Sequence, residues 1–259
     1  MSVVVLLEWT FTPSDYFEEA IEILRYDYAM IIADGKVGAK IKPAIYDANP
    51  AIRQLLQDSL NARFLGVQLL THRPYEQSRS TITRVHPDGR RDISIELESG
   101  CLVMSGGSVD FRITGKNGNI IVVSKRDRIE RKKSLAELVS AHQASDGLLT
   151  SLLRSYDAGV RDPINELVHL YEIREALSVK FGGENGVRSA LAITASQWSR
   201  LGQLSNSEPL RQGRHRGKTG ETLRDASESE LIEVRGIARA MIETYLQYLE
   251  EYNPKSIPL

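Results

Sequence analysis

The chain has 259 residues, of which 41% are hydrophobic and 26% are charged. These proportions are those of ordinary globular proteins, and they exclude a largely disordered chain. The length suffices for one large or two ordinary domains. With 33 basic and 34 acidic residues, the net charge is -1. The protein therefore has no overall field that attracts nucleic acid or membranes, and any site for a polyanion must be local.

Cysteine content and the N-terminus both point to the cytoplasm. Cys101 is the single cysteine, which excludes an internal disulfide and a multi-cysteine zinc site. The apolar run at residues 3–7 follows no basic segment and meets Glu8 too early for a signal peptide or a membrane span. We therefore expect a cytoplasmic protein without a membrane segment.

The first part of the chain carries strand and turn signals. Residues 3–11 are β-branched and apolar, which is typical of a buried strand. Residues 26–32 and 36–41 flank Asp34-Gly35, a pair that predicts a β-hairpin. Asn49-Pro50 then opens a helical pattern that continues to Phe64, with Asn as the N-cap and Pro in the first turn.

Alternating apolar patterns return in six segments after this helix. They are FLGVQLL (64–70), STITRVH (80–86), DISIELE (92–98), CLVMS (101–105), VDFRIT (109–114) and NIIVVS (119–124). Short strands at such spacing predict an antiparallel sandwich or barrel with one helix, which we interpret as a sensor or docking domain over residues 1–124. These segments carry no glycine-rich phosphate loop and no metal-ligand pattern, so we expect neither a cofactor nor a metal.

The character of the sequence changes at KRDRIERKKS, which begins at Lys125. We expect residues 125–145 to form a basic connector helix and residues 146–259 to form an all-α bundle, so that the whole chain is α+β. The predicted helices cover residues 135–144, 147–157, 163–181, 186–191, 195–204 and 228–252. The last one begins at a capping box made by Ser227 and Glu230.

The most unusual segment of the bundle is NSEPLRQGRHRGK, residues 206–218, which we call the basic loop. Its cations are Arg211, Arg214, Arg216 and Lys218. Their fixed charges and forked donors suit phosphate oxygens, and the interleaved glycines let a ligand approach the backbone closely. The loop therefore predicts a site for a nucleic-acid backbone, with Arg216 and Lys218 as phosphate-binding residues.

His215 is the one side chain of this loop that can move protons near neutral pH. As a general base it would activate a 2′-hydroxyl, while Arg211 and Arg214 would stabilise the charge that develops on the phosphate during RNA cleavage. These three residues are the predicted catalytic set. In the alternative interpretation, the loop is a mobile linker or its arginines pair with acidic residues of the bundle. Those acidic residues are Glu172, Glu175 and Glu208.

A second candidate lies at residues 186–201, where a helix, a turn and another helix are predicted. A capping box from Thr194 to Gln197 would begin the second helix. In a helix-turn-helix DNA-binding protein, Gln197 and Arg200 would face the major groove. Alternatively, Trp198 and Leu201 are core residues of an ordinary helical hairpin.

The bundle, the long helix near Pro163, the basic loop and the long last helix together resemble the HEPN-like helical domains of prokaryotic defence and toxin proteins. The resemblance covers residues 135–252. It implies a dimeric, metal-independent ribonuclease or an RNA-binding module, with an arginine and a histidine a few residues apart as the catalytic motif. Here three residues separate Arg211 from His215, fewer than is usual in that family.

We therefore expect an RNA-binding protein of a prokaryotic defence or toxin system, with metal-independent endoribonuclease activity as the mechanism to test. A homodimer is expected because two facing loops supply both a base and an acid. The β-rich domain is a candidate surface for a protein partner. The first alternative is a non-catalytic subunit of a defence complex, and the second is a DNA-binding protein.

Overall fold

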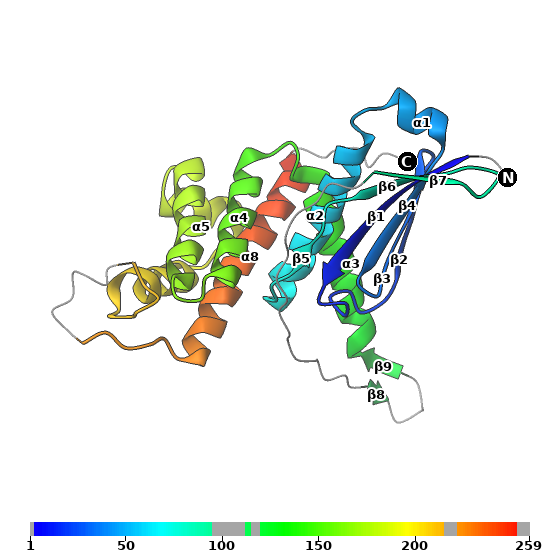
Figure 1. The fold of residues 1–259 in the computed structure, drawn as a ribbon. Coiled ribbons are helices and arrows are strands. Elements are labelled where there is room, and N and C mark those ends of the chain that lie inside the picture. The colour runs from blue at the N-terminus through cyan, green and yellow to red at the C-terminus, as the bar shows by residue number, and fades with distance from the viewer. Residues whose placement is uncertain (1–2, 95–111, 115–119, 215–221, 253–259) are drawn as a thin grey trace. The chain divides into compact units, whose positions relative to one another are not determined.

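The computed structural model describes residues 3–94, 112–114, 120–214 and 222–252 (Figure 1). Contacts divide the chain into two compact units. The β-rich unit holds residues 1–61 and 75–131, and the helical unit holds residues 62–74 and 132–259. The boundary predicted at residue 124 lies at the start of a helix, whereas the contacts change from one unit to the other within that helix.

The β-rich unit is built on one antiparallel sheet in the order β2-β3-β4-β1-β6-β7, with β5 paired to β1. Its strands are β1 (Val4–Thr12), β2 (Ile21–Leu24), β3 (Tyr28–Ala33), β4 (Lys36–Ile41), β5 (Glu76–Gln77), β6 (Thr81–Val85) and β7 (Arg91–Ser94). The strands β8 (Arg112–Thr114) and β9 (Ile120–Val123) form a separate antiparallel pair. The α+β class and the antiparallel pairing are confirmed. The described strands form an open sheet and a hairpin, rather than a sandwich or a closed barrel.

Strand β1 shows why this sheet has one apolar face. Val5, Leu7, Trp9 and Phe11 alternate along the strand and are all buried, as the period of two requires. The indole Nε1 of Trp9 donates a hydrogen bond of 2.7 Å to Oε1 of Gln57 on helix α2 (Ile52–Thr71). Helix α2 therefore covers the buried face of the sheet within this unit.

The hairpin predicted at Asp34-Gly35 joins β3 to β4 and is confirmed. Both turn residues have left-handed backbones, with φ of 49° at Asp34 and 77° at Gly35. A two-residue turn of this kind matches the right-handed twist of the flanking strands. A Cβ atom at Gly35 would also lie 3.2 Å from the carbonyl oxygen of Phe11, so both backbone conformation and space favour glycine there.

Helix α2 corrects one strand prediction. The helix predicted to end near Phe64 continues to Thr71, so the strand predicted at residues 64–70 is wrong. Phe64, Val67, Gln68 and Leu69 are all buried. Because this stretch is enclosed on more than one side, its apolar residues form an almost continuous run and lose the period of 3.6 that identifies an amphipathic helix.

The remaining strand predictions divide into three groups. Those at residues 80–86 and 119–124 are confirmed by β6 and β9. Those at 92–98 and 109–114 are confirmed over the described parts, β7 and β8. The segment at 101–105 lies outside the described residues.

Every helix predicted after residue 124 is present, and all but the last have shifted ends. The helices are α3 (Ser124–His142), α4 (Gly147–Arg161), α5 (Glu166–Phe181), α6 (Glu184–Leu191), α7 (Ala195–Gly202), a π-helical turn η1 (Gln203–Ser207) and α8 (Glu228–Tyr252). A single apolar cluster that includes Leu153, Leu170, Leu201 and Met241 joins them. None of the helices in the described part of the chain is both long and apolar enough to cross a membrane.

The predicted basic connector, residues 125–145, forms α3 up to its end at His142, and its basic run KRDRIERKKS lies in the first part of that helix. Within the β-rich unit, the guanidinium of Arg128 donates hydrogen bonds to both carboxylate oxygens of Glu18, with Nε distances of 2.8 and 3.0 Å. Lys132 is buried, with 9% of its surface exposed. At least these two cations of the connector are therefore engaged in packing.

Candidate nucleic-acid interface

The stem of the basic loop is a defined structure in the helical unit. Leu210 is buried, and it forms an isolated parallel bridge with Arg224. The backbone N–H of Arg211 donates to the carbonyl of Arg224 at 2.9 Å, and the N–H of Arg224 donates to the carbonyl of Pro209 at 3.0 Å. The two sides of the loop are thus joined at its base.

Gln212 and Gly213 extend this stem. The side-chain oxygen of Gln212 accepts a 3.0 Å hydrogen bond from the backbone N–H of Ala226. A Cβ atom at Gly213 would lie 3.2 Å from the carbonyl oxygen of Leu210 and 3.3 Å from that of Ser205. Glycine therefore permits a close approach of the backbone to η1.

Arg211 is the more accessible of the two described arginines of the loop. Its side chain is 63% exposed, and its Nε lies 3.9 Å from a carboxylate oxygen of Asp225, which is 72% exposed. An ion pair of this length and exposure contributes little, because water screens both charges. The guanidinium can therefore exchange Asp225 for a phosphate at low cost.

Arg214 is held more firmly. Its Nη1 donates a 2.5 Å hydrogen bond to Glu175 on α5, and its guanidinium lies over the ring of Tyr171, 5.2 Å from the centroid. The hydrogen bond to Glu175 raises the pKa of Arg214 above its usual value. Of the acidic partners expected in the alternative interpretation, Glu175 is the one that Arg214 contacts.

Arg174, which was not among the predicted site residues, contacts the same Tyr171 side chain. The guanidinium of Arg174 lies 4.3 Å from the ring centroid of Trp198 and 5.1 Å from that of Tyr171. It also donates a 2.7 Å hydrogen bond to the hydroxyl of Tyr171. Trp198 and Tyr171 are both buried, so Arg174 fixes the ring on which Arg214 rests.

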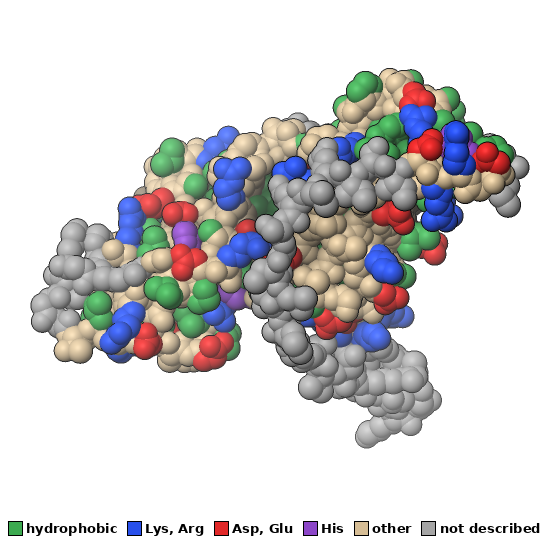
Figure 2. All heavy atoms as spheres, viewed as in Figure 1, with side chains coloured by type: hydrophobic (Ala, Val, Ile, Leu, Met, Phe, Trp, Pro, Cys, Tyr) green, Lys and Arg blue, Asp and Glu red, His purple; other side chains and the backbone are tan. Residues whose placement is uncertain are grey.

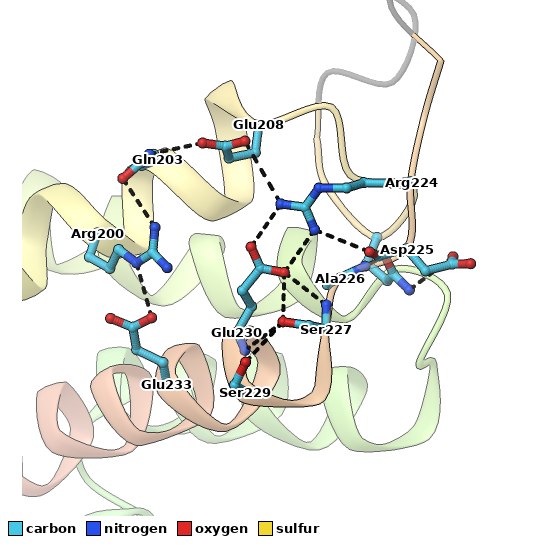
Figure 3. A network of polar contacts seen from close by, with 11 residues as sticks. Arg200, Gln203, Glu208, Arg224, Asp225, Ala226, Ser227, Ser229, Glu230 and Glu233 are labelled. Atoms are coloured by element: carbon cyan, nitrogen blue, oxygen red, sulfur yellow. Dashed lines mark hydrogen bonds and ion pairs between the residues drawn. The ribbon is translucent and has the colours of Figure 1, made fainter.

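The two residues predicted to read DNA are engaged within the bundle. Gln197 forms the predicted capping box with Thr194 at the start of α7. Arg200 donates to Glu233 at 3.0 Å and to Gln203 at 3.3 Å (Figure 3). Both side chains hold contacts that stabilise helices, and the buried Trp198 of the same helix is a core residue.

The other predicted site residues, His215, Arg216 and Lys218, lie outside the described residues. Their roles stay predictions. The structure therefore describes Arg211 and Arg214 at the start of the loop, together with the residues that anchor its two sides.

The far side of the loop ends in a polar network that begins α8 (Figure 3). The guanidinium of Arg224 donates two hydrogen bonds of 2.8 Å to the carboxylate of Glu230. Glu230 also accepts a 2.8 Å hydrogen bond from the backbone N–H of Ser227, whose hydroxyl accepts from the N–H of Glu230. The predicted capping box is thus confirmed, with Arg224 as a further member.

This network makes the helical unit sensitive to acid. The hydrogen bonds from Arg224, followed by those from Ser227, lower the pKa of Glu230 from 4.5 to about 2. Its contribution to stability is complete above about pH 4.5 and is lost as the pH falls toward 2. We expect about 2 kcal/mol of this contribution to be lost by about pH 3. Urea unfolding above about pH 4.5 and at about pH 3 should show a smaller loss of stability on acidification in Glu230→Gln than in the wild type. An equal loss in both proteins would contradict the assignment.

A second polar cluster, far from the loop in sequence, was not predicted. The carboxylate of Glu166 on α5 is buried, with 2% of its side chain exposed, and it accepts hydrogen bonds of 2.6 and 2.8 Å from Arg235 on α8. Burial raises its pKa, but the hydrogen bonds from Arg235 and His72 outweigh burial, so the net pKa is lowered. Glu166 is therefore a buried carboxylate that stays ionised because it is paired.

His72 completes this cluster in an uncommon backbone conformation, with φ of 50°. Its Nε2 lies 3.2 Å from Glu166, and its Nδ1 lies 3.3 Å from the hydroxyl of Tyr156. Both ring nitrogens face protein groups, so the ring joins elements of the bundle rather than offering a nitrogen to a ligand. Tyr156 is buried, and burial raises its pKa. The sequence held no signal for this cluster, because its members are scattered along the chain.

Comparison with protein-family models, with curated proteins and with solved structures found no match to this chain.

Proposed function

We propose that the helical unit binds RNA through the basic loop between α7 and α8, as a HEPN-like module of a prokaryotic defence or toxin system. The observation that carries this proposal is the exposed guanidinium of Arg211 on a backbone fixed to Arg224. A cation held on an ordered stem loses less conformational freedom on binding a phosphate than one on a free chain.

The local character of the charge supports the same site. Figure 2 shows basic and acidic side chains interspersed over the visible face, in keeping with the net charge of -1. A polyanion is then attracted where cations cluster in the sequence, and residues 211–218 hold four of them. Arginine offers paired donors that match phosphate oxygens.

Binding should depend on Arg211. We expect Arg211→Ala to weaken binding of a labelled single-stranded RNA about tenfold, because one charged hydrogen bond to phosphate is lost. The slope of log affinity against log salt should become shallower by about 0.7. Fluorescence anisotropy over a range of salt concentrations measures both quantities.

The matched control is Arg188→Ala, which removes an arginine that is not part of the loop and that pairs with Glu184 on α6. This variant should bind as the wild type does. If Arg211→Ala binds RNA as tightly as the wild type does, the proposed site is wrong. If the wild type binds duplex DNA more tightly than RNA, the DNA-binding alternative is favoured.

We further propose metal-independent cleavage of the bound RNA, with His215 as the general base and Arg211 and Arg214 as the groups that stabilise the transition state. Arg216 and Lys218 would hold the phosphate. Incubation with a mixed RNA pool in chelator, followed by analysis of product ends for cyclic phosphate, tests this step. Cleavage that persists in His215→Ala would remove that residue from the mechanism. Binding without cleavage would favour a non-catalytic subunit.

The assembly and location follow from the same proposal. A homodimer would bring two loops together, and the β-rich unit would be free to receive a protein partner. Light scattering after size-exclusion chromatography measures the assembly. The single cysteine supports a cytoplasmic location, where disulfides are rare.

A further inference from the structure

We propose that Glu175 is an internal competitor of RNA at Arg214, so that this carboxylate occupies the phosphate-binding edge of the guanidinium until RNA displaces it. The inference rests on the proposed function, because it concerns the same loop. It assigns a regulatory role to Glu175, a residue of α5 that lies 39 positions before Arg214 in the sequence.

The geometry of the contact is that of a carboxylate in place of a phosphate. A carboxylate oxygen of Glu175 accepts a 2.5 Å hydrogen bond from Nη1 of Arg214. Charged oxygens of carboxylate and phosphate use the same guanidinium donors. Glu175 therefore occupies one N–H donor of Nη1 and places a negative charge where a phosphate would approach.

The exposure of the pair makes exchange feasible. The side chain of Arg214 is 40% exposed and that of Glu175 is 46% exposed. Ion pairs this open to water are weak. An RNA phosphate that arrives with neighbouring contacts can therefore displace the carboxylate.

The ring of Tyr171 keeps Arg214 in position during this exchange. A cation over an aromatic ring uses the face of the guanidinium, which leaves the N–H groups at its edge for an anion. Tyr171 is itself fixed by the hydrogen bond from Arg174. When Glu175 is displaced, Arg214 thus retains its contact with Tyr171.

Removing the competitor should strengthen binding. We expect Glu175→Gln to bind single-stranded RNA about two- to fivefold more tightly than the wild type. The slope of log affinity against log salt should stay as in the wild type, because Arg214 neutralises one phosphate in both proteins. Fluorescence anisotropy with one labelled RNA measures both.

Glu172→Gln is the matched control. Glu172 lies one turn earlier on α5 and accepts a hydrogen bond from Ser155, so its substitution removes the same charge near Arg214 without removing the direct contact. It should tighten binding less than Glu175→Gln and leave the slope unchanged. When Arg214 is already replaced by alanine, Glu175→Gln should change RNA affinity no more than Glu172→Gln does, since both remove one negative charge and no direct contact remains to be lost.

The outcomes separate the two proposals. If the wild type binds RNA and Glu175→Gln binds equally or more weakly, with unchanged thermal unfolding, the competitor role is overturned while RNA binding stands. If both proteins bind RNA and Glu175→Gln binds about two- to fivefold more tightly, both proposals are supported. If neither protein binds, both are overturned.

Discussion

Replacing Glu166 with glutamine should destabilise the helical unit by about 3 kcal/mol, because it removes the countercharge from a partly buried cation. Arg235 directs two hydrogen bonds at this carboxylate, and its side chain is 23% exposed. The amide of glutamine is neutral and presents an NH₂ group to donors that need an acceptor. A loss of this size should lower the unfolding temperature by roughly 6–12 °C, which calorimetry can measure.

Glu228→Gln is the matched control for this experiment. Glu228 contacts the same Arg235 at 3.2 Å, but its side chain is 72% exposed. Its substitution should cost less than about 1 kcal/mol, since it removes a screened pair and a favourable charge in the first turn of α8. Similar losses from the two substitutions would show that burial does not set the strength of this network.

Gly66→Ala should also destabilise the protein, although alanine is the better helix former. A Cβ atom at Gly66 of α2 would lie 2.7 Å from Cα and 2.9 Å from the backbone nitrogen of Ala136 on α3. Because the obstructing atoms belong to the backbone, the two helices must separate to admit the methyl group. We expect a net loss of about 1–3 kcal/mol, measured by urea unfolding.

The control has the same substitution at an open helical position. At Gly236 of α8, no atom lies within 4 Å of the position that Cβ would take. Gly236→Ala should therefore stabilise the protein by about 0.5–1 kcal/mol, because alanine has less conformational entropy than glycine in the unfolded chain. A gain at both positions would mean that α2 and α3 are not in close contact at Gly66.

Local features of the sequence predicted the elements whose stabilising contacts are also local. Asp34-Gly35 predicted the β3–β4 hairpin because both positions need left-handed backbones, which few other residue pairs allow. Ser227 and Glu230 predicted the start of α8 because the capping box is formed between residues three apart. The alternation in β1 predicted its buried face for the same reason.

The candidate site was predicted in part. The basic loop was identified from its cations, and the structure describes Arg211 and Arg214 at its start. The sequence offered Glu172, Glu175 and Glu208 equally as partners, because neither the orientation of the helix that carries the first two nor the path of the loop was known. Packing of α5 against the loop stem selected Glu175 for Arg214. The contact of Arg174 with Tyr171 is local, because the two residues are three apart on α5.

The sequence by itself determined the α+β class, the hairpin, the last helix and the place of the basic loop, because each depends on periodicity or on residues close together in the chain. Tertiary structure decided that residues 64–70 are helical and that Glu166, His72 and Arg235 form one cluster. Both outcomes depend on contacts between distant segments. Burial on more than one side removes the helical period from α2, and a buried carboxylate is recognisable only when its partners are known.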